Sequence, residues 1–139
     1  MRILNSVCFL WLTVLCMAAH AQQKQDFPGI EISKLSEGQQ YEVGYASKLK
    51  PIVINTMHTW VIHIKDRDGQ PVSNVELSVV GGMPEHNHGL ATRPQITQNF
   101  GDGNYLLEGM KFHMGGWWQV TISIREENFS DSVTFDLQL

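Results

Sequence analysis

Three side chains that can bind a transition metal lie together in a glycine-rich stretch, residues 81–89. They are Met83, His86 and His88. Two imidazoles one residue apart project to the same side of an extended backbone, with Cα atoms about 7 Å apart, so both can reach one ion. The thioether shortly before them can join the same ion. The stretch therefore predicts a metal site.

A second group with the same chemistry follows later in the chain and contains Met110, His113 and Met114. Imidazole binds both Cu(I) and Cu(II), whereas the soft thioether favours Cu(I). Copper is therefore the expected metal, and the residue types leave its oxidation state open. The sharpest hypothesis is that folding brings the two groups to the same end of one domain.

The same residues also have a simpler interpretation. His86 and His88 can be exposed loop residues, since the His-x-His spacing carries little information by itself, and the methionines can fill gaps in a core. Two features favour the metal interpretation. Both groups lie beside glycines, which let the backbone approach an ion closely, and after residue 21 the only other histidines are His58, expected to be buried, and His63, expected to be exposed.

The elements that would position these groups are β-strands. Apolar and polar residues alternate over residues 41–45, 75–80, 118–125 and 133–139, and residues 52–65 and 105–112 are also typical of strands. Residues 66–71 and 126–128 predict hairpin turns, and residues 90–99 predict an extended connector. No stretch after residue 21 has the periodicity of a helix. The pattern predicts an all-β fold, an immunoglobulin-like antiparallel β-sandwich of about seven strands.

Residues 1–21 have the composition of a secretory signal peptide. Arg2 precedes an apolar run that ends near residue 18, and Ala19-His20-Ala21 fits a cleavage site. The run is short for a membrane span and no later stretch is longer, so the mature chain is expected to be periplasmic or secreted, with no span. Both cysteines fall inside the signal, so the exported chain would have neither thiol nor disulfide.

The rest of the chain divides into a flexible leader, residues 22–39, and one domain, residues 40–139. After cleavage the chain would carry nine basic and 14 acidic residues, a formal charge of −5, because Arg2 is the only charged residue in the signal. This balance, without a basic cluster, argues against nucleic acid or an anionic membrane as partner. A metal ion is the expected partner, and an envelope protein is a second one to consider.

The segment Met83-Pro84-Glu85-His86-Asn87-His88-Gly89 resembles the YtkA-like and FixH-like domains of exported bacterial proteins. The resemblance covers about residues 40–139 and extends to Thr92-Arg93-Pro94, Gly103-Asn104-Tyr105, Glu108-Gly109-Met110, Phe112-His113-Met114 and Gly116-Trp117-Trp118. It implies a small immunoglobulin-like fold in the bacterial envelope. Some relatives are tied to copper delivery to respiratory oxidases, which implies copper ligands at Met83, His86 and His88 first, then His113 and Met114, then Met110. FixH-like proteins are typically anchored by an N-terminal helix, whereas the cleavage site here predicts release.

These observations favour a copper carrier or chaperone over an enzyme. The chain has no Gly-x-Ser-x-Gly, no phosphate-binding glycine loop and, after residue 21, no cysteine nucleophile. Two alternatives stay open. One is a metal-free module that docks on another envelope protein through its loops. The other is a metal-dependent enzyme in which Glu85 would be the general base.

Overall fold

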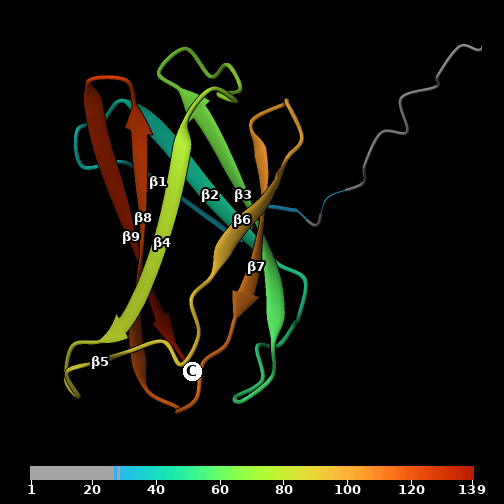
Figure 1. Cartoon of the computed structure of the whole chain (residues 1–139), viewed down its shortest axis with the longest axis vertical. Coiled ribbons are helices and arrows are strands. Elements are labelled where there is room, and N and C mark those ends of the chain that lie inside the picture. The colour runs from blue at the N-terminus through green and yellow to red at the C-terminus, as the bar shows by residue number, and fades with distance from the viewer. Residues whose placement is uncertain (1–26, 28) are drawn as a thin grey trace, which may run out of the picture.

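The computed structural model describes Phe27 and residues 29–139, so the predicted signal peptide lies outside the described part. In the described part, nine β-strands and no helix are present (Figure 1). The strands are β1 (Ile32–Leu35), β2 (Tyr41–Ser47), β3 (His58–Asp66), β4 (Glu76–Met83), β5 (His88–Gly89), β6 (Gln95–Asn99), β7 (Asn104–Met110), β8 (Trp117–Glu126) and β9 (Phe129–Gln138). Accordingly, these residues include no apolar helix that could cross a membrane.

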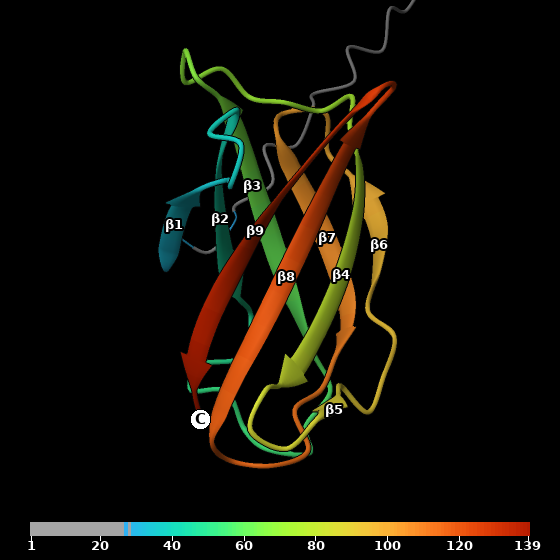
Figure 2. The same ribbon diagram turned by 90° about the vertical axis from the view of Figure 1, so that its left-hand side faces the viewer.

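The strands form two antiparallel sheets that pack as a β-sandwich, which confirms the predicted all-β fold. One sheet has the order β1-β2-β3-β7-β6 and the other has the order β5-β4-β8-β9. Figure 2 shows β4, β8 and β9 in front of β3 and β7. The long hairpin of β8 and β9 was predicted, and it is confirmed by a continuous register from Trp117↔Gln138 to Glu126↔Phe129.

Side chains that alternate along the strands fill the space between the sheets. On β8, every second residue from Trp118 to Ile124 is at most 1% exposed. On the facing sheet, Trp60 of β3 stacks on Tyr45 of β2 with ring centroids 4.1 Å apart. Each large apolar side chain buried in this way contributes about 1.5–3 kcal/mol. Since the described residues include no cysteine, this burial takes the place of disulfides.

Besides the two-residue β5, two strands lie where the sequence predicted none. β1 falls within the predicted flexible leader and pairs with β2, and β6 falls within the predicted connector and pairs with β7. Both are edge strands. All residues of β1 are exposed, and so are all those of β6 except Ile96. The hydrophobic alternation that marks a half-buried strand is therefore missing from both.

The chain between β3 and β4 crosses from one sheet to the other, so the predicted hairpin at residues 66–71 is wrong. The turn itself forms as expected, with Gly69 at φ 77°. Beyond it, Lys65 and Pro71 form a single bridge, and β4 then pairs with β8. Past the bridge the Val72 amide still donates to the carbonyl oxygen of Ile64, but β7 pairs with the rest of this edge of β3. The strand predicted from residue 52 also begins later, at His58.

Candidate metal centre

The two predicted metal-binding groups lie at the same end of the sandwich, at the bottom of Figure 1. We call this end the histidine pole and define it by His86, His88 and His113. β4 and β7 both run towards it, one from each sheet. His86 and His88 follow β4, and His113 follows β7. The antiparallel order of the strands thus brings together segments that are separate in the sequence.

A tight hairpin between β4 and β5 presents the first two histidines. The backbone amides of His86 and Asn87 both donate to the carbonyl oxygen of Met83, at 3.1 and 3.0 Å. Asn87 adopts φ 51°, a left-handed conformation that asparagine tolerates better than most residues. His88 then pairs across the hairpin with Met83. As a result His86 is exposed in the turn, whereas His88 is partly buried beside β4.

The three imidazole rings stand in a row with His88 in the middle. Its ring centroid lies 5.8 Å from that of His86, nearly parallel, and 5.1 Å from that of His113. The Nδ1 atoms of His88 and His113 are both buried and have no hydrogen-bond partner among the described residues. Buried polar atoms are usually paired. Two such nitrogens on neighbouring rings are therefore a place where a cation could supply the missing interaction.

Trp118 forms the inner wall behind these rings. Its ring meets that of His113 edge-on at 5.4 Å and that of His88 at 6.3 Å. Its indole nitrogen donates to the carbonyl oxygen of Met114 at 3.0 Å, which fixes the segment after His113. The neighbouring Trp117 donates to Asp136 on the outer face, so Trp118, and not Trp117, shields the rings.

A model of the YtkA-like family matches residues 36–123 of the chain. The chain belongs to the YtkA-like family. The match begins before β2 and ends within β8, so it contains the three histidines of the pole and Trp118. No curated protein and no solved structure matches the chain.

The three predicted methionine ligands of this YtkA-like domain occupy different surroundings. Met83 is 1% exposed, and its methyl group lies against Gly116, where a Cβ atom would come within 2.9 Å. Met114 is 38% exposed and directly follows His113. Met110 is fully buried and is paired in register with His58 of β3 rather than with a pole histidine. Met83 and Met114 are therefore the thioethers best placed to join the imidazoles.

The YtkA-like domain leaves the pole accessible on one side. An open hollow of about 390 Å³ reaches Met83, Asn87 and His88, and Gly82 and Gly89 line it beside them. Within residues 29–139, no three His, Cys, Asp or Glu side chains are already arranged to hold one ion. A complete ligand set would therefore need a thioether, or a rotation of the exposed His86 side chain.

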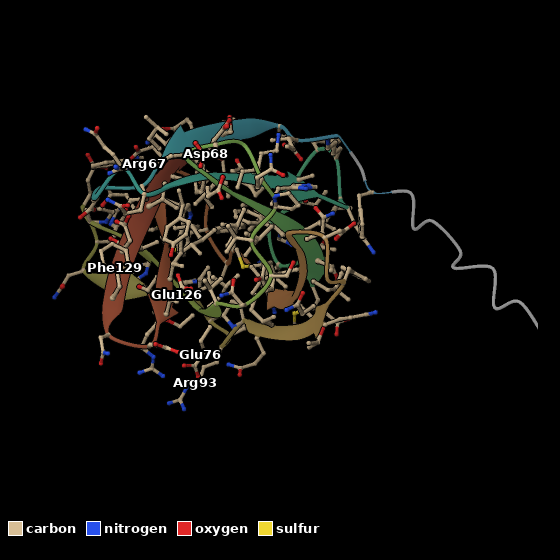
Figure 3. The ribbon with its side chains drawn as sticks, turned by 90° about the horizontal axis from the view of Figure 1, so that it is seen from above. Arg67, Asp68, Glu76, Arg93, Glu126 and Phe129 are labelled. Carbon is tan, nitrogen blue, oxygen red and sulfur yellow. The ribbon has the colours of Figure 1, made fainter. Side chains whose placement is uncertain are left out.

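A second groove, of about 570 Å³, lies at the opposite end of the YtkA-like domain and has different chemistry. Figure 3 looks down on this end and labels Arg67, Asp68, Glu126 and Phe129 around it. Tyr41 donates to Glu126 at 2.9 Å. Burial, and secondarily this bond, raises the pKa of Tyr41 to about 12. No histidine or methionine lines the groove, so it offers none of the soft-metal donors found at the histidine pole.

Proposed function

We propose that this YtkA-like protein binds copper at the histidine pole and carries it to another protein outside the cytoplasm. The observation that supports the proposal best is the pair formed by His88 and His113, whose ring centroids lie 5.1 Å apart. Leaving a buried polar atom without a partner costs about 1–3 kcal/mol. A copper ion bound between these rings would remove that cost at two nitrogens together.

The donor types at the pole favour copper over zinc. Structural zinc sites use four ligands, mostly Cys and His. The described residues include no such preformed set, and the donors that adjoin the imidazoles are the thioethers of Met83 and Met114. Thioether is a soft ligand that binds Cu(I) well, whereas imidazole accepts either oxidation state. Copper is the cargo that suits this mixture.

The arrangement of the donors supports a carrier rather than a catalyst. His88 and His113 lie against Trp118 and are partly buried, whereas His86 and Met114 are exposed. An incoming ligand of a partner protein could therefore replace the exposed donors first, while the inner imidazoles still hold the ion. Each replacement breaks one copper–ligand bond as another forms. The ion would thus move between proteins without being released into water.

An exported location is part of the same proposal. Residues 1–21, which lie outside the described part, have the composition of a cleaved signal peptide, and both cysteines fall within them. In an oxidising compartment free thiols are readily lost as ligands. Histidine and methionine are the soft and intermediate donors that keep their metal-binding form there. The chemistry of the pole therefore fits a protein that works in the bacterial envelope.

The experiment is a titration of the purified protein with Cu(I), without oxygen and against a competing chelator, and separately with Cu(II). The His86→Ala/His88→Ala double variant should bind copper at the pole at least about 100-fold more weakly, since losing even an outer-shell partner costs 10–100-fold. The His63→Ala variant is the matched control, because His63 lies on β3 beside Phe27. Unchanged affinity and stoichiometry in a folded double variant would overturn the proposal.

A further inference from the structure

One buried histidine is not used by the pole. His58 is 6% exposed, and its Nδ1 atom lies 3.1 Å from the carbonyl oxygen of Thr56. Because a carbonyl oxygen only accepts, Nδ1 carries the hydrogen, and in the neutral ring Nε2 keeps its lone pair. That Nε2 atom is buried and has no hydrogen-bond partner among the described residues. Metal-binding histidines show this arrangement, with one ring nitrogen fixed by a carbonyl and the other free for the ion.

A buried thioether lies directly across from this imidazole. His58 of β3 pairs in register with Met110 of β7, and Met110 is fully buried. Residues paired in this way on antiparallel strands have Cβ atoms roughly 4.5–5.5 Å apart on the same face of the sheet. The pair therefore places one imidazole and one thioether together inside the domain, which is the donor combination proposed for the pole.

A β-bulge is what turns Met110 towards His58. Trp60 pairs with Leu107 and His58 with Met110, so two steps along β3 correspond to three along β7. Gly109 lies in the extra step with φ 85°, a conformation that glycine adopts without strain. Side chains of a regular strand alternate between faces, so Leu107 and Met110 would otherwise point to opposite sides. Bulges often re-aim side chains beside functional sites.

We propose that His58 and Met110 form a second, inner site for a soft monovalent cation of the Cu(I) type. The choice of metal rests on the proposed function of the pole. Low charge is required, because burying a divalent ion among apolar residues would cost far more than burying a monovalent one. The thioether adds the preference for a soft ion.

The inner site is separate from the pole, and an exposed thioether lies next to it in the chain. Phe112 and Trp118 stand between the two. The ring centroid of Phe112 lies 5.7 Å from that of His58 and 5.2 Å from that of Trp118. The ring centroid of Trp118 lies 5.4 Å from that of His113. Met57, directly before His58, is 59% exposed and offers a thioether at the surface. An ion would enter there, past the loop that the Asn55 amide ties to the carbonyl oxygen of Phe112 at 2.7 Å.

Anaerobic Cu(I) titration against a competing chelator tests the inner site. The protein should bind two ions, and the pole variant His86→Ala/His88→Ala/His113→Ala should retain one. Met110→Leu, which nearly conserves volume, and His58→Phe should each lose the other ion or weaken it at least about 100-fold. Retention of both ions by Met110→Leu and His58→Phe would overturn the inner site alone. Retention of both by the pole variant would overturn the pole alone.

A second measurement follows the binding of Cu(I) in the unmodified protein. In the unmodified protein with labelled methionine methyl groups, the Met110 resonance, assigned through Met110→Leu, should shift as Cu(I) is added. The shift should also occur in the pole variant, since the inner donors are intact there. A Met110 resonance that stays in place in both proteins at saturating Cu(I) would overturn the inner site even if His58→Phe failed to fold.

Discussion

The imidazole rings of His88 and His113 lie 5.1 Å apart, centroid to centroid, although one belongs to β5 and the other follows β7. The two strands lie in different sheets. The pair therefore exists only when the sandwich is assembled, and copper bound to both rings would stabilise the folded protein over the unfolded chain.

The first prediction concerns His113. His113→Ala should weaken copper binding about as much as His88→Ala, because both rings would bind the same ion. The loss in the double variant should be smaller than the combined losses of the two single variants, since either change alone already breaks the shared site. Competition titrations of the three variants measure this. If the losses of copper-binding free energy in the two single variants added up fully in the double variant, the two rings would bind different ions.

The second prediction concerns the fluorescence of Trp118. Copper bound by His88 and His113 would lie beside this indole, whose ring is 5.4 Å from that of His113. Adding Cu(II) should therefore quench tryptophan emission, and Trp118→Phe should remove most of the quenching. Trp60→Phe is the control, because Trp60 stacks on Tyr45 within the core. If Trp60→Phe removed the quenching instead, the ion would lie elsewhere.

The third prediction concerns the packing of Met83. Gly116 adopts φ 122°, and a Cβ atom there would come within 2.9 Å of the Met83 methyl group. Gly116→Ala should therefore lower the free energy of unfolding by about 2–4 kcal/mol, through backbone strain and displacement of Met83. Gly101 also has positive φ, at 81°, but a Cβ atom there would meet nothing within 4 Å.

Gly101→Ala is accordingly the matched control and should cost only about 1–2 kcal/mol, from the backbone alone. Urea unfolding of both variants gives the comparison. Because Met83 also borders the pole, Gly116→Ala should weaken Cu(I) binding as well, whereas Gly101→Ala should not. Equal stabilities of the two variants would show that Met83 is free to move away from Gly116.

The fourth prediction concerns pH and the buried carboxylate of Asp131. Burial by itself would raise its pKa, but hydrogen bonds from the Ser36 hydroxyl and the backbone amides of Gly38 and Ser132 outweigh it, and the pKa is lowered. A lowered pKa in the folded state stabilises the protein fully above about pH 4 and progressively less as the pH falls through the folded value. Asp131→Asn should cost about 1–3 kcal/mol at neutral pH.

The Asp131→Asn variant should also lose less stability than the unmodified protein on acidification below pH 4, because the titrating group is gone. Asp136→Asn is the control. Asp136 is exposed on the outer face of the second sheet, and its replacement should change stability at neutral pH only slightly. Urea unfolding between about pH 2 and 7 measures both variants. If the free energy of unfolding of Asp131→Asn fell below pH 4 as steeply as that of the unmodified protein, the proposed role of the Asp131 carboxylate would be contradicted.

Much of the fold follows from alternation in the sequence. The strands that bury one face, such as β8 and β9, show it clearly, and they were predicted with their hairpin. β1 and β6 bury almost nothing, so hydrophobic pattern does not reveal them. The crossing from β3 to β4 depends on which sheet buries Val75 and Val79, a tertiary choice that a turn sequence does not contain.

For the candidate site, residue types and glycine-rich spacing pointed to the candidate donors, and the expectation that folding would bring both groups to one end agrees with the structure. The partner of Met110 was not predictable in the same way. It depends on the bulge at Gly109, which changes the face that later residues present. The shielding role of Trp118 likewise depends on how the β7–β8 segment turns, which its own sequence does not specify.

The most direct test of the account is nuclear magnetic resonance of nitrogen-labelled histidine side chains with Ag(I), a stable soft surrogate for Cu(I). One-bond coupling between silver and nitrogen identifies the rings that bind the ion. If both rings bind one ion, ring nitrogens of His88 and His113 show coupling to silver at the same point in the titration. Coupling to only one of them, or to neither at saturation, would contradict a shared copper site at the histidine pole.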